Sequence, residues 1–178
     1  MKQTISYTLE FFSFWHCGSG LAAGADLDSL VIKDSQGLPF IPGKTMKGLI
    51  RQAVEEVADL QSRTIDTGRL FGKEVSEKAE TFFTDAVLVD HDTIVHEKLG
   101  KYLFRSISST RIDDDGIASK GSLRSIQVVI PCKLEGKIIG IEKDDRDLFT
   151  QALSYIKAIG LKRTRGFGRC KITVTEAS

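Results

Sequence analysis

Apolar and polar residues alternate near the start of the chain, as in a β-strand that buries one face. The apolar positions are Ile5, Tyr7, Leu9 and Phe11. This alternation predicts a first strand that ends near Phe14. Similar patterns predict three further strands, over residues 82–89, 126–134 and 170–174. We expect the chain to turn at residues 135–136, directly after the third strand, and to continue into residues 137–142.

Two segments carry apolar residues at the spacing of an amphipathic helix. The first runs from Met46 to Leu60. The second begins among three aspartates, carries its apolar stripe as far as Ile159 and is followed by Gly160, an arrangement that helix ends prefer. The order strand, helix, strand, strand, helix, strand predicts an α+β fold with a ferredoxin-like (RRM-like) split βαβ core. Residues 1–178 are expected to form one domain.

Composition limits the possible functions. The chain has 178 residues, 41% of them hydrophobic, and a net charge of +1, so a nucleic-acid-binding surface would have to come from local clustering of cations. No signal-peptide pattern opens the sequence and no apolar run reaches transmembrane length. The cysteines at positions 17, 132 and 170 are scattered and lack metal-ligand spacing. We therefore expect a cytoplasmic protein without a zinc site.

Residues 160–169 are the strongest chemical signal. Their sequence, G-L-K-R-T-R-G-F-G-R, contains four cations and three glycines and no acid. Glycines let a backbone approach a ligand closely, and arginines grip phosphate in a planar fork. The segment joins the second helix to the last strand, so it predicts a flexible cationic loop of the kind that binds a nucleic-acid backbone. A solvated basic turn is the alternative.

The start of the first helix is also cationic. The sequence G-K-T at residues 43–45 resembles the end of a P-loop, but the upstream glycine has the wrong spacing and two prolines intervene, so we exclude nucleotide hydrolysis here. Lys44 and Lys47 oppose the helix macrodipole, with Arg51 one turn further on. Such a cost is tolerated if an anion is bound there. Lysines on a solvated face explain the pattern equally well.

Histidines and aspartates give weaker signals. His16 could be an acid–base group, but a structural role is favoured because no partner at catalytic spacing is evident. His91 and His96 are interpreted as part of a polar loop, and the D-D-D-G run at residues 113–116 as a turn at a loop tip. Asp26, Asp28 and Asp34 are by default turn or cap residues.

Taken together, several segments resemble the RAMP superfamily of CRISPR-associated RNA-binding proteins, and in particular the backbone subunits of type III effector complexes. These segments are a glycine loop and D-S-L-V-I-K-D over residues 18–34, I-P-G-K-T-M-K-G-L at 41–49 with Arg51, L-F-G at 70–72 with F-T-D-A at 83–86, T-R-I-D at 110–113 with G-S-L at 121–123, and the loop 160–169. The resemblance covers nearly the whole chain in the correct order.

The resemblance implies a subunit that binds guide RNA and repeats along it, with complementary target RNA, other copies of itself and other effector subunits as partners. A thumb at about residues 101–125 would reach over the guide–target duplex, and base pairing would supply sequence recognition. The implied RNA-binding residues are Lys44, Thr45, Lys47, Arg51, Arg111, Lys162, Arg163, Arg165, Gly166, Phe167 and Arg169.

Asp28 matches the acid with which type III backbone subunits cleave target RNA, and Asp26 is the next candidate. In that family cleavage depends on a divalent cation, Mg²⁺ or Mn²⁺, so the resemblance implies a possible metal-dependent endoribonuclease. Two alternatives remain open at this stage. The chain could be a RAMP scaffold or capping subunit that does not cleave, or a guide-processing endoribonuclease that uses His16. The sequence lacks the aromatic strand motifs of an ordinary RRM protein.

Overall fold

The computed structural model describes residues 2–20, 29–72, 79–110, 112–113, 115–117, 119 and 122–175. The strands within these residues are β1 (Lys2–Phe11), β2 (Phe82–Phe83), β3 (Val87–Leu88), β4 (Phe104–Ser109), β5 (Arg124–Val129), β6 (Lys133–Glu142) and β7 (Cys170–Thr175). The α-helices are α1 (Gly43–Leu60), α2 (Thr67–Phe71), α3 (His91–His96) and α4 (Arg146–Tyr155), and the 3-10 turns are η1 (Gly100–Leu103), η2 (Lys143–Asp145) and η3 (Arg163–Arg165).

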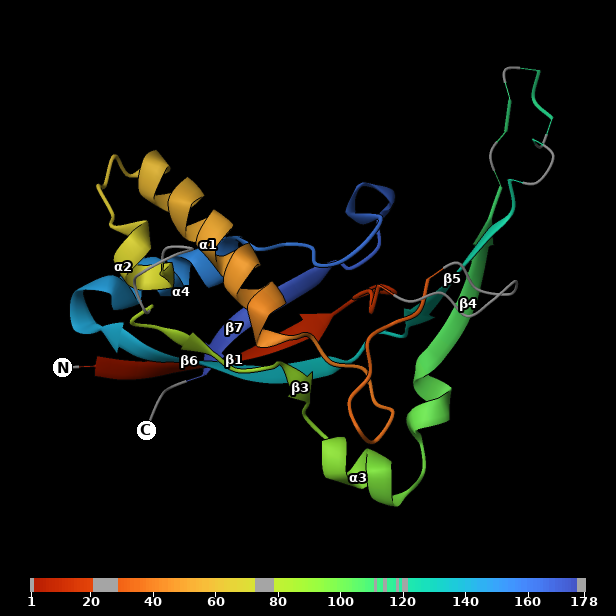
Figure 1. Cartoon of the computed structure of the whole chain (residues 1–178), viewed down its shortest axis with the longest axis horizontal. Helices are drawn as coiled ribbons and strands as arrows, with labels where there is room; N and C mark the ends of the chain where they lie inside the picture. The colour runs from red at the N-terminus through yellow and green to blue at the C-terminus, as the bar shows by residue number, and fades with distance from the viewer. Residues whose placement is uncertain are drawn as a thin grey trace.

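The central sheet has the strand order β2-β6-β1-β7, and β3 also pairs with β6. All these pairs are antiparallel. The helices α1, α2 and α4 lie on one side of this sheet (Figure 1). Alternate residues of β1 (Ile5, Tyr7 and Leu9) are buried. On the opposite face, which these helices do not cover, alternate positions of β6 and β7 such as Lys137 and Lys171 are exposed.

Strands β4 and β5 form a separate two-stranded sheet that projects away from the core (Figure 1). Ile107 of β4 lies opposite Ile126 of β5. The base of this hairpin is tied to the core, because Trp15 and Val129 exchange backbone hydrogen bonds of 3.0 and 2.8 Å. The hairpin covers the segment expected to form a thumb, and its second strand continues to Val129 rather than ending near residue 125.

The predicted strand over residues 126–134 and its turn at residues 135–136 are wrong. The chain breaks instead at residues 130–132, where Pro131 supplies no backbone N–H for a sheet. Glu135 and Gly136 lie inside β6, which pairs with β1 along its length. Gly136 belongs there because the Tyr7 ring covers it and would meet any added Cβ. The predicted strand 82–89 is also wrong as one element, since it forms β2 and β3.

Other boundaries differ as well. Strand β1 ends at Phe11 rather than near Phe14. Helix α4 ends at Tyr155, although Ile159 remains buried as the apolar spacing suggested. The segment after α4 leaves the helix because its backbone pairs with the last strand region, where the Cys170 N–H donates to the Lys157 carbonyl at 2.9 Å. Residues 91–96 form the short helix α3 instead of a loop. No helix within the described ranges is both long and apolar enough to cross a membrane.

Candidate nucleic-acid interface

The glycine-rich loop (residues 160–169) is fixed at its base. The Ile159 N–H donates to the Gly168 carbonyl at 3.0 Å, and the Gly168 N–H donates to the Phe14 carbonyl at 2.7 Å. The Leu161 N–H donates to the His16 carbonyl at 3.1 Å. These bonds join the loop to itself and to the segment that follows β1. The loop is therefore anchored at its ends, and its middle extends from a rigid base.

Two of the loop glycines are required by close backbone approach. Gly160 and Gly168 have φ angles of +97° and +66°, and a Cβ at either position would collide with a carbonyl oxygen, of His16 and Ile159 respectively. Gly166 also has a positive φ, of +83°, but open space surrounds it. The glycines therefore do different things: two let the loop close, and the third turns its exposed tip.

The exposed tip of the loop carries arginines. Arg163 and Arg165 form η3 and both are exposed. Neither makes an ion pair with an acidic side chain in the part of the chain that the structure describes. Lys162 instead donates from Nζ to the Ser109 hydroxyl at 3.2 Å, which joins the loop to the end of β4. In Figure 1 the loop rises between α1 and the hairpin.

The other two predicted loop residues, Phe167 and Arg169, are held more closely by the rest of the chain than Arg163 and Arg165 are. Phe167 is half-buried, so its ring is only partly open for stacking on a base. Arg169 is exposed, and its backbone is bonded to the segment after β1: its N–H donates to the Ser13 hydroxyl at 3.0 Å and its carbonyl accepts from the Phe12 N–H at 2.9 Å.

The cations of α1 form a second group. Lys44, Lys47 and Arg51 are three and four residues apart, so they share one stripe of the helix. Lys44 and Thr45 are exposed and Lys47 is half-buried. Arg51 is exposed but paired, because its Nε donates to Glu55 at 2.9 Å. Among the described residues neither Lys44 nor Lys47 has an acidic partner, so two lysines at the start of α1 are available to an anion.

The start of α1 is bonded to an acid, Asp85, which the sequence showed only as part of the F-T-D-A motif. The Gly43 N–H donates to Asp85 Oδ1 at 2.7 Å. The segments are also joined through their backbones, since Ile41 and Ala86 exchange hydrogen bonds of 3.0 and 2.9 Å. A Cβ on Gly43 would collide with the Phe83 carbonyl oxygen. The I-P-G and F-T-D-A segments are therefore one structural unit that fixes the beginning of α1, and the Asp85 carboxylate takes a position that a bound phosphate would otherwise favour.

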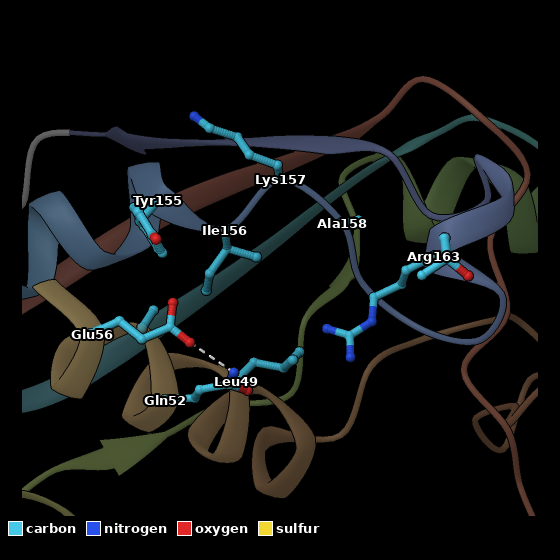
Figure 2. A pocket seen from close by; sticks show the side chains of 10 residues that line it. Leu49, Gln52, Glu56, Tyr155, Ile156, Lys157, Ala158 and Arg163 are labelled. Atoms are coloured by element: carbon cyan, nitrogen blue, oxygen red, sulfur yellow. Dashed lines mark hydrogen bonds between the residues drawn. The ribbon is translucent and has the colours of Figure 1, made fainter.

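A pocket of about 400 Å³ lies between α1 and the segment that runs from the end of α4 into the loop (Figure 2). Of the predicted RNA-binding residues that the structure describes, only Arg163 lines it. The polar residues Gln52, Glu56 and Tyr155 also line it and were missed from the sequence. No residue type or spacing marks them, because they become neighbours only when α1 packs beside α4. That one RNA strand contacts both the loop cations and the α1 lysines stays a prediction.

His16 is fully buried and both ring nitrogens have partners. Nδ1 lies 2.6 Å from the Gln127 carbonyl oxygen and Nε2 lies 3.0 Å from the Ser29 hydroxyl. Because a carbonyl oxygen only accepts, Nδ1 is the donor, and in a neutral ring Nε2 accepts from Ser29. His16 thus joins the segment after β1 to β5 and to Ser29, which is the structural role favoured over acid–base chemistry.

Asp34 is a turn residue, as predicted: its Oδ1 accepts from the N–H groups of Gln36 and Leu38 at 2.8 and 2.9 Å. Asp26, Asp28 and Arg111 lie outside the described residues. Within the described ranges, no three His, Cys, Asp or Glu side chains are grouped so that they could hold a metal ion. The described residues therefore supply no candidate ligand set for the implied divalent cation.

Two comparisons with known proteins find similarity to this chain, and one of them identifies a family. A family model described as "RAMPs: RAMP superfamily" matches residues 8–171. A chain of a Type III-B Cmr-beta complex bound to cognate target RNA is similar to this chain, with 13% identity over 96% of both chains and a TM-score of 0.73. A chain of Type III-B Cmr-beta in the apo state is similar with 14% identity, 98% coverage of both chains and a TM-score of 0.73.

At such low identity the solved structures show a shared fold alone. The search of curated proteins found no significant match. The family match extends from within β1 into β7 and thus includes both helices of the core, the hairpin and the glycine-rich loop. On the strength of this match the chain belongs to the RAMP superfamily.

Proposed function

We propose that this protein is a guide-RNA-binding subunit that repeats along the backbone of a type III CRISPR effector complex. The core would be a ferredoxin-like split βαβ unit, which is supported by the antiparallel order β2-β6-β1-β7 with α1 and α4 on one face. Membership of the RAMP superfamily and the fold shared with chains of Cmr-beta complexes support the type III assignment.

The observation that carries the proposal is the glycine-rich loop, whose two exposed arginines have no acidic partner among the residues that the structure describes. A protein of net charge +1 has no general attraction for RNA, so binding must come from cations that are concentrated and not neutralised by neighbouring acids. Arg163 and Arg165 meet that condition on a loop whose base is rigid. Guanidinium groups bind phosphate oxygens in two-pronged pairs, and Lys44 and Lys47 would extend the contact along the RNA backbone.

The hairpin β4–β5 suggests how copies would assemble. It projects from the core. Among the described residues, backbone hydrogen bonds tie its base to the core, and Ser109 at the far end of β4 accepts from Lys162 of the glycine-rich loop. As a thumb it would reach over the guide–target duplex toward the next copy, which gives a head-to-tail array whose length follows the RNA. Light scattering with guide RNAs of increasing length would show stepwise growth in mass. A mass that stays monomeric with every guide would contradict this part of the proposal.

A paired substitution tests RNA binding. Lys47→Gln with Arg165→Gln removes one cation from each group, whereas Lys137→Gln with Lys171→Gln removes two exposed cations from the uncovered face of the sheet. For single-stranded RNA, each lost phosphate contact lowers the slope of log affinity against log salt by about 0.7. The first variant should bind more weakly, with a slope lower by about 1.4. The second should match the wild type. Equal affinity of both variants at every salt concentration would refute the interface.

Cleavage of target RNA is the finer proposal, and it depends on Asp28. What the structure describes nearby is Ser29, whose carbonyl accepts from the Gln127 N–H at 3.0 Å and whose hydroxyl contacts His16. The chain directly after Asp28 is therefore bound to the base of the hairpin, which would lie beside the target strand. A scaffold that binds RNA without cleaving it is the alternative. The guide-processing reading loses support because His16 is buried and its ring is fully bonded.

A further inference from the structure

The pocket between α1 and the glycine-rich loop has the character of a site for a flat organic group. Its volume of about 400 Å³ is in the range of small-ligand sites. Leu49 and Ala53 of α1 line one side, and Ile156 and Ala158, which follow α4, line the other. Figure 2 shows Leu49 on α1, and Ile156 and Ala158 on the segment that leads toward the loop. Two apolar sides suit the faces of an aromatic ring, which lose water favourably when covered.

Charged side chains of both signs line the pocket: Glu56, Arg163 and Lys157, the last of which donates from Nζ to the Ser154 carbonyl at 2.5 Å. Glu56 points into the pocket from α1 and Arg163 approaches from the loop (Figure 2). Gln52 Nε2 donates to Glu56 Oε1 at 2.8 Å, so the carboxylate is held in place by its neighbour one turn away. An ionised carboxylate only accepts hydrogen bonds. A phosphate would be repelled from the Glu56 end, so the pocket differs in chemistry from the phosphate-binding surface proposed for the loop tip.

We propose that this pocket binds a guanine base turned out of the RNA strand. Guanine has two adjacent donors, N1–H and N2–H, on one edge, and they match the Glu56 carboxylate. Its other edge has the acceptors O6 and N7, which arginine recognises with two hydrogen bonds. Single-stranded RNA exposes these edges, and proteins read them in this way. Adenine, cytosine and uracil each lack the paired donors opposite a carboxylate.

The pocket also lies where RNA would pass. Arg163 belongs both to the pocket and to the exposed cationic tip, so a strand held by its phosphates at the tip needs to turn only one nucleotide inward. Tyr155, 45% exposed at the pocket wall, offers an additional ring surface to the same base. The subunit would thus prefer guanine at one position of the strand. This inference rests on the proposed RNA-binding function.

The test compares two RNA oligomers of about eight nucleotides, one of uridines only and one with a single central guanosine. Short strands slide, so the guanosine can reach the pocket. Fluorescence anisotropy with the full chain should show about tenfold tighter binding of the guanosine oligomer, because a bidentate base contact contributes about that factor. Replacing guanosine by inosine, which lacks the 2-amino group, should reduce the preference, and Glu56→Gln should abolish it. Glu55→Gln makes the same charge change on the same helix and should leave the preference intact.

Each outcome separates the two proposals. Equal binding of both oligomers by the wild type overturns the guanine pocket and leaves RNA binding standing. A guanosine preference that survives in Glu56→Gln, or that is equally lost in Glu55→Gln, overturns the assignment to this pocket. Absence of binding to either oligomer contradicts the proposed RNA-binding function and, with it, the proposal that the pocket binds guanine.

Discussion

Gly168 and Gly166 lie two residues apart in the glycine-rich loop, both with positive φ, yet alanine should affect them differently. A left-handed conformation costs a residue with a Cβ about 1–2 kcal/mol, and alanine recovers about 0.4–1 kcal/mol by restricting the unfolded chain. At Gly166 nothing lies within 4 Å of an added Cβ, so the net cost there is about 1 kcal/mol. At Gly168 the Cβ would also collide with the Ile159 carbonyl.

That collision endangers the hydrogen bonds that close the loop. Moving Gly168 away from Ile159 lengthens its bonds with Ile159 and Phe14, 3.0 and 2.7 Å at present, each of which contributes about 0.5–1.5 kcal/mol. The total cost at Gly168 is about 3 kcal/mol. In a domain of this size the melting temperature should fall by about 6–12 °C for Gly168→Ala and by about 2–4 °C for Gly166→Ala. Calorimetry of both variants measures the difference, and equal shifts would refute the reasoning.

Three further predictions concern other parts of the chain. Asp145→Asn should lower the free energy of unfolding by about 2 kcal/mol in urea titrations, because the buried carboxylate accepts from Arg69 and Arg63 at 2.6 and 3.2 Å; an unchanged midpoint would contradict this. Hydrogen bonds to Asp34 and then to Asp92 raise the pKa of His91, so this contribution to stability is complete below about pH 6.5 and is lost as the pH rises through the raised value. Wild type and His91→Gln should therefore converge in stability as the pH rises above about 6.5, and a difference that stays constant during that rise would refute the assignment. Asp28→Ala should keep guide binding but abolish Mg²⁺- or Mn²⁺-dependent cuts in complementary RNA; cleavage that survives moves the active site to Asp26 or elsewhere.

The sequence predicted α1 and β7 well because their periodicity is long or bounded by clear signals. It failed at β5 and β6, where one apolar alternation runs through Pro131 into a different sheet. Periodicity reports that alternate residues are covered and does not say by which strand. The same ambiguity extended the second helix to Ile159. That residue is buried as its spacing implied, but it is covered after the chain has left the helix to pair with Gly168.

The part of the candidate site that is one continuous segment could be predicted from the sequence. The part formed by residues that are distant in the sequence could not. The glycines and cations of residues 160–169 mark this segment as a candidate site, and the structure shows its arginines exposed. Glu56 and Arg163 are more than a hundred residues apart in the sequence, and nothing in either neighbourhood predicts that they line one pocket. Asp85 is similar, because its bond to Gly43 exists only once the F-T-D-A segment has paired beside the start of α1.

The family signatures in this chain therefore combine two kinds of residue, and burial separates them. Ile41, Gly43 and Ala86 are buried and bonded to one another's segments, so they fix where α1 begins. Lys44 and Lys47 follow directly and take their position from that anchor. A change at Gly43 would displace these lysines without removing a charge, because Phe83 leaves no room for a side chain there. In a test of the proposed RNA binding, loss of binding after a signature substitution therefore implicates a contact residue only when the helix start is intact. Lys44 and Lys47, and not Gly43, are thus the informative positions for the proposed interface.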